Sequence, residues 1–458
     1  MDTATAAHAV EGRLLGANVR FTRVVTDSRA LAPGDLFVAL KGERFDGHDF
    51  VEAAREKGAV AALVALDRAD ALAGNLIAVP DPLHALGALA THWRARYALP
   101  VIAIVGSNGK TTVKEMLAAV LRAHFGDARV LATEGNLNNA IGLPLTLLRL
   151  RPEHAAAAIE LGMNHPGETA ELAAIAQPTI AVINNAQREH QEFMRSVGDV
   201  AEEHAAIVRA LPPGGTLVLN ADDAHADIWR AAAREREGVR VLEFALDAAA
   251  AVRLDAASAP GARPIVFSTP EGDASVRLAA PGGHSTANAL AAAAAALAIG
   301  VPLAAVVRGL EAFRPVAGRL AATKSSAGAA VIDDTYNANP DSVLAAIDVL
   351  AAAPAPRWLV LGDMGEVGAN GPAFHREVGE RARDAGIERL LTVGTLATES
   401  AAAFGTGAQH FVSVEALAAH LAATAKAGTT ILVKGSRFMR MERVVAALCA
   451  SFGGEGAH

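Results

Sequence analysis

The chain has 458 residues, of which 52% are hydrophobic and 20% are charged, a balance that is typical of a folded globular protein and excludes a chain that is disordered throughout. Its formal net charge is −8, from 41 Lys and Arg against 49 Asp and Glu, and no basic block stands out, so we expect no nucleic-acid partner. Cys449 is the only cysteine, which excludes a disulfide within the chain, and no stretch has the pattern of a signal peptide or a membrane anchor, so we expect a cytoplasmic protein.

Strand-like and helix-like stretches alternate along the chain, and its length favours about three domains. The first segment ends before Pro100 and is predicted to form a small α/β domain over residues 1–97. Its predicted strands are the short apolar runs 36–40, 60–64 and 76–79.

The second segment opens with the most informative stretch of the sequence. The apolar run 101–105 predicts a buried strand, the loop GSNGKTT spans 106–112, and apolar residues at helical spacing continue to Gly126. A strand, a glycine-bounded loop, Lys-Thr and a helix in this order predict a site for nucleotide phosphates. The spacing G-x-x-G-K-T-T is shorter than the common G-x-x-x-x-G-K-[ST].

Each residue type in this loop suits the chemistry of a phosphate site. Gly106 and Gly109 let backbone N–H groups curve around phosphate oxygens, and the start of the helix adds positive potential. Lys110 can reach the β and γ phosphates, and the Thr111 hydroxyl can hold Mg²⁺. We therefore expect ATP and Mg²⁺ as cofactors.

The remaining strands predict two further α/β units. Residues 98–317 are expected to form a central P-loop-type ATPase domain with a parallel sheet, and residues 318–458 a C-terminal Rossmann-like domain without the G-x-G-x-x-G loop. The predicted strands are 156–161, 180–183 and 216–219 in the central domain and 330–333, 358–361, 390–393 and 430–433 in the C-terminal domain. Ligands in such sheets bind beyond the carboxyl ends of the strands. The polar residues expected there include Glu160, Asn184, Asp334, Asp363 and Lys434.

Two of the strand ends carry candidate metal ligands. Glu160 closes its strand near the phosphate loop, where it is either a Mg²⁺ ligand or a solvated loop acid. His190 follows the strand that ends at Ile183, and a single histidine is more often structural. Together, Thr111, Glu160 and His190 form a set of oxygen and imidazole ligands that could hold one or two Mg²⁺ ions.

Motifs along nearly the whole chain resemble those of one enzyme family. The motifs are TDSRALAPGDLFVALKGERFDGHDF (26–50), GSNGKTT (106–112), EGNLNNAIGLP (134–144), ELGMNHPGE (160–168), NNAQREH (184–190), LNADD (219–223), HSTANALAAAAA (284–295), DDTYNANPDSVLAAI (333–347) and LGDMGEVG (361–368). Their combination resembles the Mur ligases, ATP-dependent amide-forming enzymes of peptidoglycan synthesis. The last two motifs are similar to those of the member that adds the terminal dipeptide.

The resemblance implies a specific reaction. A carboxylate of UDP-N-acetylmuramoyl-tripeptide would be activated as an acyl phosphate by ATP, and the amine of D-alanyl-D-alanine would then form the amide. Such a ligase serves cell-wall biogenesis and thereby cell shape, division and the cell cycle. The sequence leaves the third residue of the tripeptide open between lysine and diaminopimelate, and we expect a monomer.

The resemblance also implies roles for individual residues. The implied catalytic residues are Lys110, Glu160, His190 and Arg319, and the implied metal ligands are Thr111, Glu160, His190 and His204. The implied ATP contacts are Gly106, Ser107, Asn108, Gly109, Lys110, Thr111, Thr112, His284, Asn288 and Arg319. The implied substrate contacts are Ser28, Arg29, Lys41, Phe45, Asp46, Gly47, His48, Asn138, Asn139, Asp334, Tyr336, Asn337, Asn339, Lys434 and Ser436.

Simpler explanations remain open for some of these residues. His284 and Asn288 either contact the adenine or cap the helix that follows Gly283. Arg319 follows the hinge-like Gly318 and is therefore favoured as a phosphate contact over a solvated linker charge. A turn alone would explain the loop 337–342.

The chain departs from the family at one position. Many members carry a lysine, modified to a carbamate that helps to hold the second Mg²⁺, about fourteen residues beyond the histidine that matches His190. Here that position is His204, and no lysine occurs from 115 to 323. A neutral imidazole binds metals but brings no negative charge. Our hypothesis is that His204, Glu203 or a nonprotein anion holds the second metal.

Two other functions compete with the leading interpretation. A related ligase could add a single amino acid or glutamate, although the N-terminal motifs favour a UDP-sugar substrate. A binding module could use ATP only to close its domains, but such gating does not require Lys110, Glu160, His190 and Arg319 together.

Overall fold

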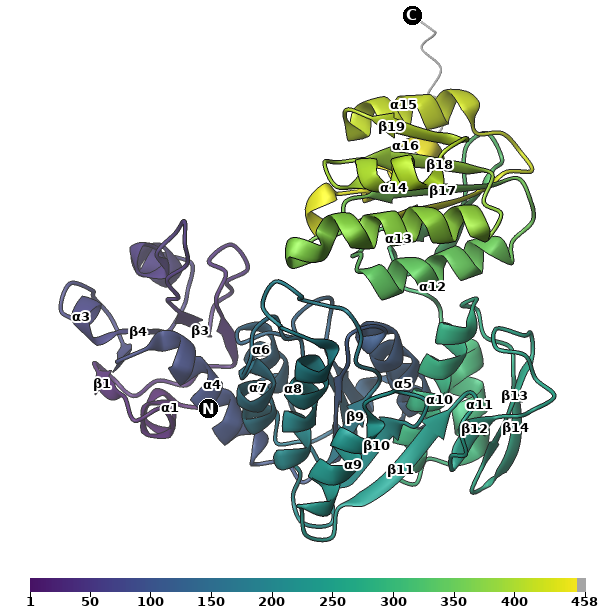
Figure 1. The fold of residues 1–458 in the computed structure, drawn as a ribbon. Coiled ribbons are helices and arrows are strands. Elements are labelled where there is room, and N and C mark those ends of the chain that lie inside the picture. Colours follow the sequence, from purple (N-terminus) through teal and green to yellow (C-terminus); the bar gives the residue numbers. More distant parts are fainter. Residues whose placement is uncertain (451–458) are drawn as a thin grey trace, which may run out of the picture.

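A computed structural model describes residues 1–450 of the chain. Figure 1 shows three α/β units that follow one another along the sequence, with the N-terminal unit on the left, the central unit at the lower right and the C-terminal unit above it. Each unit is built on one sheet, of five, nine and six strands respectively in the described residues. The predicted three-domain α/β fold is therefore confirmed.

The N-terminal unit has a mostly parallel sheet. Its strands are β1 (Arg13–Leu15), β2 (Arg23–Val25), β3 (Asp35–Val38), β4 (Ala61–Ala65) and β5 (Leu76–Val79), and its helices are α1 (Thr3–Ala9), η1 (Gly47–Phe50), α2 (Val51–Glu56), α3 (Leu66–Ala69) and α4 (Pro82–Arg94). The strand order is β1-β5-β4-β3-β2, and only β1 runs antiparallel to its neighbour. The strands β3, β4 and β5 are almost wholly buried, which explains their continuous apolar sequences.

The phosphate-loop strand is an interior strand of the sheet of the central unit. Its strands are β6 (Val101–Val105), β7 (Val130–Ala132), β8 (Ala156–Glu160), β9 (Ile180–Ile183), β10 (Thr216–Asn220), β11 (Arg240–Ala245), β12 (Val252–Leu254), β13 (Ile265–Thr269) and β14 (Gly272–Val276). The order is β14-β13-β12-β11-β10-β9-β6-β8-β7, so β6 lies between β8 and β9 and runs parallel to both. The carboxyl ends of these three strands therefore meet at one edge.

Helices cover both faces of the central sheet. They are α5 (Lys110–Phe125), η2 (Asp127–Arg129), α6 (Gly142–Leu147), α7 (Glu168–Ala176), α8 (Val197–Arg209), α9 (Ala226–Arg234), α10 (Gly283–Leu297) and α11 (Leu303–Ala312). One core joins α5, α10 and α11 to the sheet, and a second core joins α6 to α9, together with α4, to its other face. This double cover makes β6 buried at every residue.

The C-terminal unit is a parallel sheet with one antiparallel edge strand. Its strands are β15 (Ala321–Lys324), β16 (Ala330–Asp334), β17 (Arg357–Gly362), β18 (Arg389–Val393), β19 (Ala408–Phe411) and β20 (Thr430–Lys434), and its helices are α12 (Pro340–Ala351), η3 (Gly368–Asn370), α13 (Gly371–Asp384), α14 (Ala397–Phe404), α15 (Val414–Thr424), η4 (Arg437–Met439) and α16 (Glu442–Cys449). The order is β15-β16-β20-β17-β18-β19, and β15 is the antiparallel strand. Helices α12 to α14 cover one face, and α15 and α16 cover the other.

The predicted strands in all three units coincide with observed strands to within about two residues at each end. The antiparallel extension β12–β14 of the central sheet was not predicted, because its short strands alternate buried and exposed side chains and lack long apolar runs. The domain limits at 97 and 317 stay predictions, and the strands of the three sheets fall on the expected sides of them.

The contact between α5 and α11 generates a test of the central core. A Cβ atom added at Gly309 would lie 2.3 Å from the Cα of Val120, which is backbone and cannot move aside alone. We expect Gly309→Ala to lower the free energy of unfolding by about 1–3 kcal/mol, measured by chemical denaturation. Gly198→Ala in α8, where the added Cβ meets only the Ser196 hydroxyl at 3.4 Å, is the matched control and should be neutral or stabilising. Equal stability of Gly309→Ala and wild type would contradict this packing.

Candidate active site

The loop between β6 and α5 has the backbone of a phosphate cradle. Gly106 and Gly109 adopt φ values of 142° and 83°, which residues with a Cβ atom rarely adopt. A Cβ at Gly109 would lie 2.4 Å from Oδ1 of Asn288 and 2.7 Å from Nδ2 of Asn184. The two glycines therefore bring the loop against neighbouring elements and leave backbone N–H groups at the start of α5, as the motif predicted.

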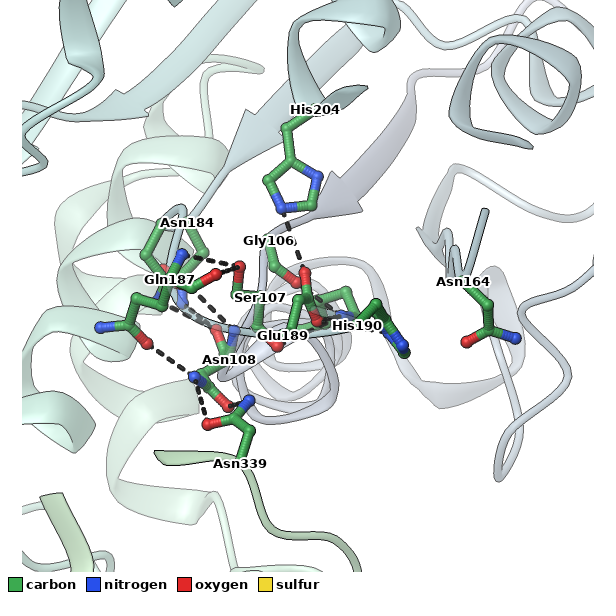
Figure 2. Close-up of polar contacts among 12 residues, drawn as sticks. Gly106, Ser107, Asn108, Asn164, Asn184, Gln187, Glu189, His190, His204 and Asn339 are labelled. Carbon is green, nitrogen blue, oxygen red and sulfur yellow. Dashed lines mark hydrogen bonds and ion pairs between the residues drawn. The ribbon is translucent and has the colours of Figure 1, made fainter. Parts of the chain in front are cut away.

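Polar side chains from the end of β9 hold this loop in place. The Asn108 N–H donates to Oδ1 of Asn185 at 2.8 Å, and Nδ2 of Asn184 donates to the Asn108 carbonyl at 2.8 Å. The Gln187 N–H donates to the Ser107 hydroxyl at 2.8 Å. Figure 2 shows this set of contacts around Ser107 and Asn108. Asn184 was expected at the strand end, whereas the role of Gln187 was not predicted.

The phosphate loop opens into a cleft of about 1060 Å³ between the central and C-terminal units. Most of the predicted site residues line it, although they are far apart in the sequence. Those that line the cleft are Ser107, Asn108, Gly109, Lys110, Thr111, Thr112, Asn138, Asn139, Glu160, His190, His284, Asn288, Arg319, Asp334, Tyr336, Asn337, Asn339 and Lys434.

Thr111 and Glu160 meet beneath the loop. The Thr111 hydroxyl donates to Oε2 of Glu160 at 2.8 Å, and Nδ2 of Asn138 donates to Oε1 at 2.7 Å. The Glu160 side chain is nearly fully buried, which disfavours the alternative of a solvated loop acid. Within residues 1–450, no group of three or more His, Cys, Asp or Glu side chains is arranged to hold a metal ion. A Mg²⁺ ion here would therefore need the Thr111 hydroxyl, phosphate oxygens or water as further ligands.

Lys110 lies over its own loop. Its Nζ donates to the Gly106 carbonyl at 2.5 Å and to the Ser107 carbonyl at 3.4 Å. It also lies 3.5 Å from Oε2 of Glu189. The ammonium is thus placed at the mouth of the phosphate cradle with a carboxylate on its other side.

Glu189 is a buried acid that the sequence analysis missed. It is 5% exposed, and its Oε1 lies 3.4 Å from Nε2 of His204, while its Oε2 lies 3.6 Å from Nε2 of His190. Burial alone would raise the pKa of Glu189, but Lys110, His204 and His190 together lower this pKa to about 2. Figure 2 shows Glu189 between His204 and the phosphate loop. Its position beside His190, after the same strand, was the signal available in the sequence.

The two protein side chains in our hypothesis for the second metal lie in different surroundings. Glu203 accepts from the N–H groups of Gly167 and Thr169, both at 2.8 Å, at the start of α7, so it stabilises that helix end. His204 is fully buried and is not among the residues that line the cleft. Its nearest ionic partner is Glu189, so His204 faces the site only through this carboxylate.

Charged side chains connect the central and C-terminal units beside the cleft. The Arg188 guanidinium binds Asp341 of α12 at 2.6 Å and Glu377 of α13 at 2.7 Å. Nδ1 of His190 lies 2.5 Å from Oε2 of Glu366 on the loop after β17. This contact lowers the pKa of Glu366, although partial burial opposes it.

An amide pair adds to the connection between the two units. Nδ2 of Asn339 donates to Oδ1 of Asn108 at 3.0 Å, and the reverse bond is 3.3 Å long. Asn339 also caps α12 by accepting from the Ser342 N–H. The phosphate loop thereby touches the helix start that the motif NANPDS forms.

The C-terminal wall of the cleft places cationic groups opposite the loop. Nζ of Lys434 donates to Oδ2 of Asp334 at 2.6 Å and to the Asn337 carbonyl at 2.9 Å. The Arg319 guanidinium stacks on the Tyr336 ring at 3.9 Å from its centroid. Ser436 is not among the lining residues, and its hydroxyl donates to the Ala338 carbonyl and thus supports the wall.

The structure also bears on the two explanations for His284 and Asn288. Helix α10 begins at Gly283, and its N-cap Gly282 receives no side-chain cap, so these residues are not a capping pair. Oδ1 of Asn288 instead accepts from Nδ2 of Asn184 at 2.9 Å. Burial lowers the pKa of His284 and thus favours the neutral form of its ring. Both side chains line the cleft, as a nucleotide contact requires.

The predicted UDP-sugar residues lie apart from this cleft in the N-terminal unit. The backbones of Lys41 and Asp46 form an isolated antiparallel bridge across a loop. His48 is buried, with its Nδ1 2.5 Å from Oδ1 of Asp46 and its Nε2 accepting from the Ala65 N–H at 2.9 Å. Phe45 at the tip is 73% exposed. His48 thus holds the loop in shape rather than facing solvent. The other members of the set are Ser28, Arg29 and Gly47, and none of the set lines the cleft.

A glycine-rich phosphate loop at the carboxyl edge of a parallel sheet, facing a second α/β unit across a cleft, defines a nucleotide-dependent enzyme. Residues 20–94 match the Mur ligase family catalytic domain, residues 104–296 match the Mur ligase middle domain, and residues 318–437 match the Mur ligase glutamate ligase domain.

Individual relatives agree over nearly the full length. The chain is 42% identical to a UDP-N-acetylmuramoyl-tripeptide–D-alanyl-D-alanine ligase of Escherichia coli strain K12, over 96% of both chains. A crystal structure of MurF from Acinetobacter baumannii superposes with a TM-score of 0.89 at 34% identity, covering 98% of this chain and 99% of that one. MurF from Thermotoga maritima, solved in complex with ADP, gives 0.80 at 28% identity over 93% and 96%. The chain belongs to the Mur ligase family and is an ATP-dependent ligase.

The close approach at Gly109 generates a binding test. We expect Gly109→Ala to weaken the binding of ADP at least tenfold, measured by calorimetry, because the added Cβ would collide with Asn288 and Asn184. Gly214→Ala is the matched control, because Gly214 has a similar φ of 77° but open space around it. Unchanged ADP affinity in Gly109→Ala would contradict the cradle.

The N-terminal loop generates a pH test. The His48 N–H, the His48 ring and Arg68 lower the pKa of Asp46 from 3.8 to about 2. Because the folded pKa is below the unfolded one, this stabilisation is complete above pH 4 and is lost as the pH falls toward 2. We expect Asp46→Asn to cost about 1 kcal/mol at pH 7, with the difference from wild type shrinking below pH 4 in denaturant titrations.

The exposed Asp67→Asn serves as the control for this experiment and should change stability by less than about 0.5 kcal/mol. A difference between wild type and Asp46→Asn that stays constant from pH 7 to pH 3 would show that the charge of Asp46 does not stabilise the loop.

Proposed function

We propose that this ligase joins D-alanyl-D-alanine to UDP-N-acetylmuramoyl-tripeptide through an acyl-phosphate intermediate, in the synthesis of the peptidoglycan precursor. The full-length agreement with ligases of that name supports the choice of substrates. The observation that carries the proposal is the cleft, in which Lys110 and Glu160 of the central unit lie opposite Arg319 and Lys434 of the C-terminal side. This reaction places the enzyme in cell-wall biogenesis and thus in cell shape and division.

The charges in the cleft suit the first step. A carboxylate does not react with an amine at neutral pH until one of its oxygens becomes part of a leaving group. Transfer of the γ-phosphoryl group requires two anions, the carboxylate and the triphosphate, to approach each other. Lys110 and Arg319 provide positive charge that offsets this repulsion and the charge that develops on the transferred group.

The residues around the loop also suit Mg²⁺. The Thr111 hydroxyl and the Glu160 carboxylate, which meet at 2.8 Å, would hold the ion. When bound, Mg²⁺ would supply positive charge that reduces the repulsion between the phosphate groups and the incoming carboxylate. Asn138 would keep Glu160 oriented by its hydrogen bond to Oε1.

The second step needs little assistance from the protein. The amine of a free amino acid or dipeptide has a pKa of roughly 7.7–8.0, so a useful fraction is neutral at physiological pH. The neutral amine attacks the acyl carbon, the carbon–oxygen bond to phosphate breaks, and the nitrogen loses one proton to the departing phosphate or to water as the amide forms. The C-terminal wall, with Asp334, Asn337 and Lys434, would position the dipeptide for this attack.

The division of labour follows the predicted domains. Residues 1–97 would bind the UDP-sugar, 98–317 would bind ATP, and 318–458 would bind the dipeptide. We further propose that the enzyme is a cytoplasmic monomer. In the described part of the chain no helix is long and apolar enough to cross a membrane.

The proposal is tested by measuring phosphate release with Mg-ATP, UDP-N-acetylmuramoyl-tripeptide and D-alanyl-D-alanine, omitting each in turn. We expect turnover only with all three and a pentapeptide product by mass spectrometry. Turnover with a single amino acid instead of the dipeptide would assign a related ligase activity. Binding of ATP without any turnover would favour the binding module and contradict the proposal.

A further inference from the structure

Glu189 is a buried carboxylate with an unused acceptor beside the phosphate loop. Its side chain is 6% exposed, and its Oε1 has no hydrogen-bond partner. Buried carboxylates normally have partners because an unpaired charge is costly to desolvate. The Lys110, His190 and His204 side chains keep Glu189 ionised, and its carboxylate therefore stays available as a ligand for a cation that arrives with the substrates.

The groups around Glu189 are those of a metal subsite. Nε2 of His190, which lines the cleft, lies 3.6 Å from Oε2 of Glu189, and Nζ of Lys110 lies 3.5 Å from the same oxygen. When Lys110 binds a phosphate group, the negative charge of the nucleotide offsets the positive charge of the ammonium. Another cation is then required to stabilise the Glu189 carboxylate. A carboxylate and an imidazole beside a bound phosphate are ligands for a divalent ion.

The position of His204 explains why this chain needs a different anion. The resemblance to the family implies that many members carry a modified lysine at the position of His204, and its carbamate is a carboxylate on a side chain. Here the imidazole of His204 is fully buried, with its Nε2 3.4 Å from Oε1 of Glu189. The His204 side chain thus ends at the carboxylate group of Glu189 (Figure 2).

We propose that Glu189 supplies the carboxylate that the family's modified lysine provides elsewhere, and that Glu189 and His190 hold the second Mg²⁺ of the nucleotide complex. His204 is a positioning residue that orients Glu189 and does not bind the metal. This inference rests on the proposed use of Mg-ATP. It replaces our sequence-based hypothesis of His204, Glu203 or a nonprotein anion as the holder.

The inference is tested by counting bound Mn²⁺ with electron paramagnetic resonance, in the presence of a non-hydrolysable ATP analogue. We expect two Mn²⁺ ions per wild-type protein and one in Glu189→Gln, which keeps the shape but removes the charge. Glu189→Asp keeps a carboxylate and should retain the second ion with affinity reduced about tenfold, and it covers the case in which Glu189→Gln does not fold. His204→Gln should bind both ions, and the Mn²⁺ affinity of its weaker site should differ from that of wild type by less than tenfold.

Two controls separate the possible failures. The exposed Glu202→Gln on α8 should bind two ions like wild type. Wild type in buffer freed of carbon dioxide should also bind two, because no carbamate or bicarbonate is needed. A second ion retained at full affinity in Glu189→Gln, lost in His204→Gln, or dependent on bicarbonate would overturn the inference. Absence of any Mn²⁺–nucleotide binding would instead count against the proposed function on which it rests.

Discussion

Charged side chains of opposite sign are concentrated at the carboxyl ends of β6, β8 and β9, where little water reaches them. Lys110, Glu160 and Glu189 all lie at this edge, and each is mostly or fully buried. In such surroundings, electrostatic interactions are stronger than in water, and each charge depends on its neighbours. The parallel order of the three strands brings these residues together, so the sheet topology determines the chemistry of the site.

The second constraint is the contact between the central and C-terminal units. Arg188 reaches Asp341 and Glu377, and His190 reaches Glu366, so residues next to the phosphate loop are also the residues that bind the other unit. His190 is a proposed metal ligand that already contacts a carboxylate of the facing unit. Metal binding and domain arrangement are therefore expected to influence each other, because Glu366 holds Nδ1 of the ring whose Nε2 faces the proposed metal site.

Much of this architecture follows from local sequence patterns. The runs 101–105 and 156–161 are apolar because their strands are buried on both faces, and Gly106 and Gly109 mark the cradle. The sequence motifs also predicted most of the site residues that the fold brings together in the cleft. Glu189 and Arg188 were missed because their importance comes from residues distant in the sequence, such as His204, Asp341 and Glu377. No local sequence pattern predicts that a carboxylate will be buried beside an ammonium group.

The central claim is that two carboxylates, Glu160 and Glu189, hold the metal ions at this edge of the sheet. The most direct test is a crystal structure with Mn²⁺ and a non-hydrolysable ATP analogue, in which anomalous scattering locates each ion. The account predicts one ion bonded to Thr111 and Glu160 and a second bonded to Glu189 and His190. A second ion bonded to His204, or no ion in contact with Glu189, would contradict it.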